Sequence, residues 1–468
     1  MNDLLTYPKF AVVGHPNKGK SSIVASLAMD DTVAISDTPG TTTHKKSYPL
    51  KVDGEVLYEL YDTPGFQRAR AVLAWLRQHD VSADRRHEVV KAFIDVHRND
   101  LRFSDEIELL EPIMEGAGII YIVDASKPYG EEYEAEMEIL RWTGQPSMAL
   151  INHIDAQDYS TSWKQALGGY FQMIRSYNPM TATPAQHIAI LESMAQLREE
   201  WTAQVKRSVA LFQTYHTQMI ERSSVVIVSL MQRALRYVAR MPLENESADE
   251  AAKDALMRAY KETLRRFEAE AQKQIDRIWH HDHMQKEVTP IGFEEMDLFS
   301  EESASVFGLT RKELLITGIT GGALTGAGID LLFAGHTFFI GGAIGAVAGG
   351  IGAFMAFDEL SDIKVLGKRL GRRYLETGPM QNRNFPYILL GRMLYYTTAV
   401  VIRSHAKRDT FVLTPDHAFK EKWLDEKSKK ILERFHKQLR SGKKMDDQAQ
   451  REYEALVSQK LADVMGRE

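Results

Sequence analysis

The sequence predicts an α/β domain with a mostly parallel, six-stranded sheet, followed by a largely α-helical region. Short apolar runs at 10–13, 56–61, 119–124 and 148–151 alternate with charged, helix-compatible stretches, which is typical of strands in such a sheet. Beyond residue 184, apolar residues recur at spacings of three and four, which predicts long helices. A chain of 468 residues has room for two or three domains.

The composition narrows the class of protein. The 58 basic and 64 acidic residues give a net charge of −6, so the chain has no overall attraction to nucleic acid. The absence of cysteine excludes disulfides and thiolate metal sites. The first ten residues carry no basic segment followed by a long apolar one, so we expect no signal peptide and a cytoplasmic location.

A phosphate-binding loop follows the first predicted strand. Residues 14–22 read GHPNKGKSS, with two glycines four residues apart and Lys20 and Ser21 directly after the second. Strand, loop and helix in this order form a P-loop, whose backbone N–H groups face phosphate oxygens. Gly19 lets the backbone come close, Lys20 can reach the β- and γ-phosphates, and the Ser21 hydroxyl can bind Mg²⁺.

A second phosphate-proximal motif ends the strand at 56–61, which pairs with 46–52 across a tight turn at 53–54. It reads DTPG at residues 62–65. Asp62 can hold Mg²⁺ through water, and Gly65 can donate its N–H to the γ-phosphate. We therefore expect both residues beside the P-loop.

The base-recognition motif follows the strand at 148–151 and reads Asn152, His153, Ile154, Asp155. A carboxylate accepts hydrogen bonds from both the N1–H and the 2-amino group of guanine, and adenine offers neither pattern. Asp155 therefore indicates GTP and GDP as ligands. The last base-contact loop is assigned by position alone, after a strand at 173–177.

With these motifs, residues 1–182 resemble the bacterial Era/TrmE-type GTPases of the TRAFAC class, whose loops read GxPNxGKS, a TT pair, DTPG and NKxD. The resemblance implies a Ras-like P-loop GTPase fold and Mg²⁺-dependent hydrolysis of GTP. It assigns the Mg²⁺-binding switch threonine to Thr42, within PGTTTH at 39–44. The nucleotide-binding residues that it implies are Asn17, Lys18, Gly19, Lys20, Ser21, Ser22, Asn152, His153 and Asp155; the catalytic ones are Lys20, Thr42 and Gly65; the metal ligands are Ser21, Thr42 and Asp62.

Three positions specialise or depart from this pattern. His153 stands where the motif usually has lysine. Phe66 follows DTPG where Ras-like enzymes place a water-orienting glutamine, so another group must orient the water. In related GTPases the asparagine at the position of Asn17 helps to bind K⁺, which replaces an arginine finger; a plain loop-capping role is the alternative.

An insertion at 68–112 separates the DTPG motif from the next strand. Its sequence is helical and rich in charge. It is either an effector surface that responds to loss of the γ-phosphate or a solvated helical decoration.

The remaining sequence divides into a helical bundle at 183–311, a glycine-rich apolar hairpin at 312–358 and a C-terminal helical region at 359–468. The apolar run at 385–402 contains Arg392 and is expected to be a core helix. The run of His280, His281, Asp282 and His283 is not expected to share a metal ion, because adjacent helical residues point in different directions.

Glycines spaced by four residues mark the hairpin, and basic residues lie on both sides of it. Two legs of about 20 residues are near the length that spans a bilayer core. Contact with membrane lipid through 314–357, burial as a packed helical hairpin, and a homo-oligomerisation surface all remain open.

Three functions follow from this reading. The first is a GTP-hydrolysing nucleotide switch, peripheral on the inner face of the cell membrane, that acts on a protein effector. The second is a ribosome or RNA assembly GTPase, although we identify no RNA-clamp segment of the KH type and no basic, aromatic-interleaved surface at the C-terminus, so nucleic acid is not the expected partner. The third is a nucleotide-gated protein scaffold with little turnover.

Overall fold

The computed structural model of the chain describes residues 7–33, 35, 45–52, 54–242, 250–288, 354–358, 364–365, 368–369, 373–380, 385–413 and 424–465. It divides into two compact units. The first unit comprises Met1–Gln218, His280–Gln285 and Val401–Asp409, and the second comprises Met219–Trp279, Lys286–Val400 and Thr410–Glu468.

A six-stranded sheet forms the centre of the first unit, with the order β2-β3-β1-β4-β5-β6. Strand β2 runs antiparallel to β3, and the other neighbouring pairs are parallel. The predicted fold class is therefore confirmed. The strands are β1 (Lys9–Val13), β2 (Lys46–Val52), β3 (Glu55–Asp62), β4 (Gly118–Asp124), β5 (Ser147–Asn152) and β6 (Met173–Ser176).

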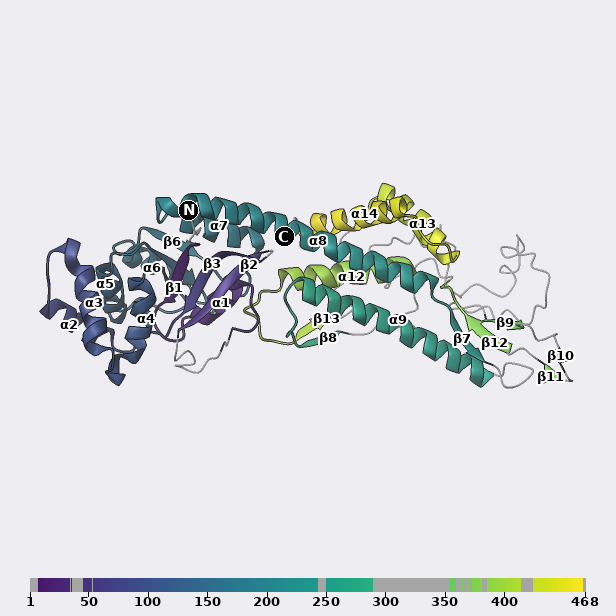
Figure 1. The fold of residues 1–468 in the computed structure, drawn as a ribbon, viewed down its shortest axis with the longest axis horizontal. Coiled ribbons are helices and arrows are strands. Elements are labelled where there is room, and N and C mark those ends of the chain that lie inside the picture. Colours follow the sequence, from purple (N-terminus) through teal and green to yellow (C-terminus); the bar gives the residue numbers. More distant parts are fainter. Residues whose placement is uncertain are drawn as a thin grey trace. The chain divides into compact units, whose positions relative to one another are not determined.

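Both faces of this sheet are covered, because successive side chains of a strand point to opposite sides. In β1, Ala11 and Val13 belong to one hydrophobic cluster, and Phe10 and Val12 belong to the other. Residues of α5 (Glu132–Trp142) and α6 (Ser160–Leu167) pack in the first cluster, and those of α1 (Lys20–Ala28) and α7 (Pro184–Ala195) pack in the second (Figure 1).

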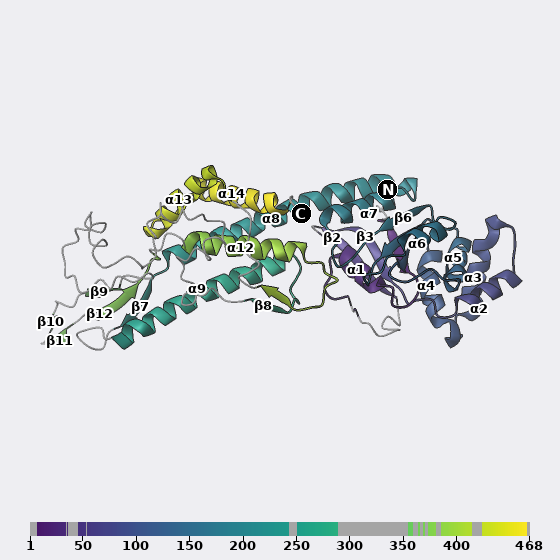
Figure 2. The same ribbon diagram turned by 180° about the vertical axis from the view of Figure 1, so that it is seen from behind.

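The predicted insertion is helical, as expected. It contains α2 (Ala69–Gln78), α3 (Arg86–His97) and α4 (Ser104–Met114), with short 3₁₀ turns before α3 and α4. Figures 1 and 2 show α2 and α3 together at one end of this unit. Their apolar residues join the same hydrophobic cluster as α5, so the insertion is built into the core of the domain.

Long helices dominate the second unit. They are α8 (Thr202–Arg236), which begins in the first unit, α9 (Glu250–Ile278), α12 (Phe385–Ile402), α13 (Glu426–Arg440) and α14 (Asp447–Met465). Among the described residues, α12 is long and apolar enough to cross a membrane, yet 78% of it is buried. Its Arg392 Nε donates to Glu268 of α9 at 2.7 Å. This burial agrees with the predicted core helix.

The domain boundaries differ from the predicted ones. The first unit extends past residue 182 to Gln218, because α7 and the start of α8 pack on the sheet. It also includes His280–Gln285 and Val401–Asp409. The regions predicted to be helical also contain a three-stranded antiparallel sheet of β7 (Ala239–Pro242), β12 (Arg373–Thr377) and β9 (Phe354–Asp358).

Strand β9 corrects the last five residues of the predicted helical hairpin, since they pair with β12. The rest of 312–358 lies outside the described residues, as does the switch segment at 36–44 with Thr42. Short pairs complete the strands that the structure describes: β8 (Lys286–Val288) with β13 (Phe411–Leu413), and β10 (Lys364–Val365) with β11 (Lys368–Arg369).

Candidate nucleotide-binding site

The P-loop connects β1 to α1 as predicted. Gly19 precedes α1 with φ 83°, in the left-handed region that favours glycine. A Cβ atom at Gly19 would lie 2.4 Å from Asn152 Nδ2, which itself donates to the Lys18 carbonyl at 3.2 Å. Glycine is therefore required here by both conformation and space, and Asn152 ties the end of β5 to the loop.

Lys20 is buried at the start of α1, with 8% of its surface exposed. Its Nζ donates to the carbonyls of Gly14 at 3.2 Å and His15 at 3.1 Å. Burial lowers the pKa of Lys20 to about 8, against the opposing influence of Asp62 and Glu136. A buried ammonium group that donates to two neutral carbonyls of its own loop can turn to a phosphate at little cost.

Ser21 and Asp62 come together as predicted. The Ser21 hydroxyl donates to Asp62 Oδ2 at 2.8 Å, although the two residues are 41 positions apart. Hydroxyl and carboxylate oxygens are the ligands that Mg²⁺ prefers, so this donor pair fits the expected metal. The third predicted ligand, Thr42, is outside the described residues.

The DTPG motif packs against the P-loop. A Cβ atom at Gly65 would lie 2.7 Å from the Pro16 nitrogen, and Thr63 Oγ1 donates to the Val12 carbonyl at 2.8 Å. The next residue, Phe66, is 2% exposed and belongs to the hydrophobic core. Phe66 therefore packs in the core, and the expectation that another group orients the water stays a prediction.

The base-recognition residues are more open. Asp155 is exposed, and His153 Nε2 lies 2.9 Å from Ser160 Oγ. Asn17, at the tip of the P-loop, is exposed with φ 60°. The remaining predicted residues, Lys18 and Ser22, are buried, and Lys18 Nζ lies 3.9 Å from Asp124 at the end of β4.

Glu136 is a buried support of the loop that the sequence reading did not identify. Its Oε1 lies 2.7 Å from His15 Nδ1, and its Oε2 accepts from the Tyr121 hydroxyl at 2.9 Å. Because Glu136 is only 1% exposed, this contact fixes His15 against α5. His15 inside the P-loop was the one sign in the sequence that such a partner exists, and the partner lies 121 residues away.

Helix α4 contacts the chain next to both switch segments. Glu106 Oε1 accepts the backbone N–H groups of Gln67 at 2.9 Å and Arg68 at 2.5 Å, directly after DTPG-Phe66. Glu108 Oε2 accepts the backbone N–H of Lys45 at 2.6 Å, where the chain leaves the predicted switch I. One helix of the insertion thus touches residues next to two segments whose positions depend on the γ-phosphate in GTPases.

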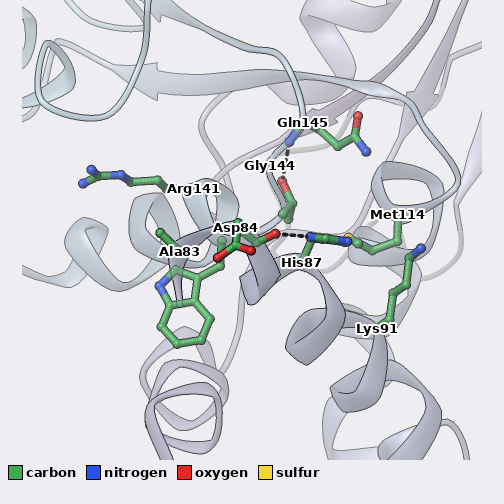
Figure 3. Close-up of a pocket in the computed structure, with 10 residues that line it drawn as sticks. Ala83, Asp84, His87, Lys91, Met114, Arg141, Gly144 and Gln145 are labelled. Atoms are coloured by element: carbon green, nitrogen blue, oxygen red, sulfur yellow. Dashed lines mark hydrogen bonds between the residues drawn. The ribbon is translucent and has the colours of Figure 1, made fainter. Parts of the chain in front are cut away.

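A separate cavity of about 360 Å³ lies where α3 meets the ends of α4 and α5. Figure 3 shows Asp84 and His87 between Arg141 and Lys91, and His87 Nδ1 lies 3.1 Å from the Asp84 carbonyl. None of the residues that line it belongs to the P-loop or to the DTPG motif, so it is distinct from the nucleotide site. Its lining is Ala83, Asp84, His87, Lys91, Met114, Arg141, Trp142, Thr143, Gly144 and Gln145.

The sheet order, the P-loop with its buried lysine, the Ser21–Asp62 pair and the Asn152 contact define a P-loop GTPase domain. Residues 164–463 match the family described as "Domain of unknown function (DUF3482)", and the chain belongs to this family. Residues 9–153 match the family described as "50S ribosome-binding GTPase".

Curated relatives agree with this class. GTPase Der of Agathobacter rectalis is 38% identical over 149 residues, which are 32% of this chain and 28% of the relative. GTPase Der of Mycoplasma pneumoniae is 25% identical over 209 residues, 43% of this chain and 40% of the relative. The chain thus spans less than half the length of these relatives. A solved structure of Aquifex aeolicus Era with GDP and AlF4⁻ is 12% identical, with a TM-score of 0.28 over 58% of this chain and 89% of that one.

Proposed function

We propose that this chain binds guanine nucleotides and hydrolyses GTP to GDP and phosphate as a conformational switch. The observation that carries the proposal is the buried Lys20, held by carbonyls of its own loop beside the Ser21–Asp62 pair. Asp155 supplies the preference for guanine.

In the proposed mechanism, Lys20 and the backbone N–H groups of the P-loop neutralise the phosphates. Ser21, Thr42 and Asp62 would hold the Mg²⁺ ion, which would supply further positive charge. Phe66 is buried in the core and has no polar group that could orient water. The backbone of Thr42 and Gly65 therefore positions a water molecule for in-line attack on the γ-phosphorus. Asn17 is the residue proposed to bind K⁺ next to the transferring group.

The base assignment is tested by nucleotide binding to the Asp155→Asn variant. The change from carboxylate to amide reverses the purine hydrogen-bond pattern, so GTP affinity is expected to fall and xanthosine triphosphate affinity to rise. Asp95→Asn, an exposed aspartate of α3, is the matched control. Unchanged GTP affinity in Asp155→Asn would contradict the assignment to guanine.

The catalytic part of the proposal is tested by single-turnover hydrolysis in potassium and then in sodium. Faster turnover in potassium, lost in Asn17→Ala, is the expected result. A rate near the uncatalysed one in both salts would instead favour the nucleotide-gated scaffold.

We further propose that α4 passes the nucleotide state to an effector. Its support is the pair of contacts that Glu106 and Glu108 make next to the two switch segments. Amide hydrogen exchange in residues 104–114 is expected to differ between the GDP form and the form with a non-hydrolysable GTP analogue. Identical exchange in both forms would remove α4 from the pathway.

Action at the inner membrane surface is a proposal from the sequence of 314–357. It is tested by co-sedimentation with anionic vesicles in the GTP-analogue and GDP states. No binding to the vesicles in either state would remove it.

A ribosome-associated function is the second candidate. It is favoured by the description of the family that residues 9–153 match. Nucleotide-dependent co-migration with the large ribosomal subunit in a density gradient would support it.

A further inference from the structure

Three side chains from distant parts of the sequence meet in the first unit. Asp31 follows α1, His281 lies in the segment His280–Gln285, and His405 lies in the segment Val401–Asp409. Asp31 Oδ2 is 3.3 Å from His281 Nδ1, and Asp31 Oδ1 is 2.6 Å from His405 Nδ1. One potential ligand atom from each residue lies within 4.8 Å of the others.

The hydrogen bond on the far side of His281 fixes its tautomer. His281 Nε2 lies 3.1 Å from the Arg403 carbonyl, and a carbonyl oxygen accepts only from an N–H. In the neutral ring, Nδ1 then carries a lone pair and is a hydrogen-bond acceptor. It faces an oxygen of Asp31, which is an acceptor as well. A positive charge between these two atoms would satisfy both, and a backbone carbonyl behind the ring is a common support of a metal-binding histidine.

The second histidine faces the other oxygen of the same carboxylate. The two imidazole rings stack with their centres 4.1 Å apart, and both direct Nδ1 toward the same carboxylate. Two imidazoles and one carboxylate form the type of donor set that binds Zn²⁺ and neighbouring transition metals.

The spacing of the ligand atoms is compatible with such an ion. Two ligands of a tetrahedral zinc, each about 2.0–2.1 Å from the metal, lie about 3.4 Å apart. The contact between Asp31 and His281 already has this length. The shorter contact between Asp31 and His405 would open by roughly 0.8 Å as the rings tilt apart.

The segment that carries His405 is held in place by other contacts. Ser404 Oγ donates to the Pro179 carbonyl, and Arg408 Nη2 donates to the Val33 carbonyl at 2.8 Å. His405 is 6% exposed and His281 3%, so their positions are set by packing. Ligands supported in this way are preorganised for binding.

We propose that Asp31, His281 and His405 form a binding site for one divalent transition-metal ion of the zinc type, with a fourth position open to water or another ligand. The site joins the chain after α1 to two segments from the C-terminal half of the sequence. It is separate from the Mg²⁺ ligands Ser21 and Asp62 and does not depend on the proposed function.

The other residues of the run 280–283 have different surroundings. His280 Nε2 lies 2.6 Å from the Tyr215 hydroxyl, and Asp282 and His283 are exposed. His281 alone turns toward Asp31 and His405. His283 therefore offers a matched control two residues away.

The test is a zinc titration of the metal-stripped full chain, in excess Mg²⁺ and GDP so that the nucleotide site is occupied. Uptake of about one Zn²⁺ per chain with a rise in Tm is the expected result. Cobalt should give the visible absorption of a low-coordinate site with nitrogen ligands. A wild-type chain that takes up no zinc and shows no such cobalt spectrum overturns the proposal without any variant.

Variants then locate the site. His405→Gln and Asp31→Asn are each expected to weaken zinc binding by at least about 100-fold, whereas His283→Gln binds as the wild type does. Circular dichroism and GDP binding verify that each variant folds. Zinc affinity that stays at the wild-type level in folded His405→Gln and Asp31→Asn overturns the proposal.

Discussion

Lys20 in the first unit and Arg392 in the second are both buried cations, each less than a tenth exposed, yet their partners differ in charge. Lys20 donates to two neutral carbonyls of its own loop. Arg392 donates to the carboxylate of Glu268 at 2.7 Å. The positive charge of Lys20 is therefore available to bind an anionic ligand, whereas that of Arg392 is paired with Glu268 and holds α12 to α9.

A second buried charge in the second unit is also paired with groups of the protein itself. Asp276 of α9 accepts from the Tyr396 hydroxyl of α12 at 2.5 Å and from Lys286 Nζ at 2.5 Å. Buried charges that are paired within the protein confer stability only while both partners are present. The difference between Lys20, which is available to a ligand, and Arg392, which is paired within the protein, can be tested directly.

The largest effect is expected for Arg392→Met. The substitution keeps an unbranched apolar stem but leaves Glu268 buried without this partner, which costs about 3–5 kcal/mol of unfolding free energy. Urea unfolding followed by circular dichroism measures the loss, and GDP affinity should remain within about twofold while the protein is folded. Arg434→Met is the control, because its partner pair with Glu452 is exposed and contributes at most about 1 kcal/mol. Equal losses in the two variants would contradict the comparison.

Lys20→Ala should show the opposite profile. We expect GDP affinity to fall by at least about 100-fold, or about 2.8 kcal/mol, because the phosphates lose a charge-assisted donor. The stability of the nucleotide-free protein should change by less than about 1 kcal/mol, since no buried carboxylate loses a direct partner. Fluorescent-nucleotide titration measures the affinity, with the exposed Lys164→Ala as control. A large loss of stability in Lys20→Ala would remove the distinction between the two cations.

Glu106→Ala tests the link between α4 and the DTPG segment. Two backbone N–H groups lose a charged acceptor, which costs about 1.5–3 kcal/mol. Hydrogen exchange should accelerate at Gln67, Arg68 and the first turn of α2. Glu115→Ala, an exposed glutamate at the end of the same helix, should leave that exchange unchanged. Matching exchange in both variants would mean that α4 does not hold this segment.

The smallest effect concerns pH. The pKa of Lys20 is about 8 in the protein, and bound phosphates raise it, so nucleotide binding takes up a proton at alkaline pH. GDP affinity should therefore be constant below about pH 7 and fall as pH rises through 8, by at most about tenfold per unit. Isothermal titration at several pH values measures this. The same dependence in Lys20→Ala would assign it to another group.

Much of the first unit could be predicted because its signals are local. Runs of about ten residues or fewer carry the patterns that predict the six strands, the P-loop and the helices of the insertion. Within such a run, the periodicity of apolar residues and the placement of glycine determine the local structure. The short strands Ala239–Pro242 and Phe354–Asp358 were missed, because a strand is stabilised by its partner and theirs lies elsewhere in the sequence.

By itself, the sequence determined the fold class and the phosphate-binding chemistry, since these depend on residue types at fixed short spacings. The tertiary structure alone decided which distant side chains support them. Glu136 meets His15 across 121 positions, and His405 meets Asp31 across 374. Such contacts arise from burial and packing of whole elements, which leave no periodic trace in the neighbouring residues.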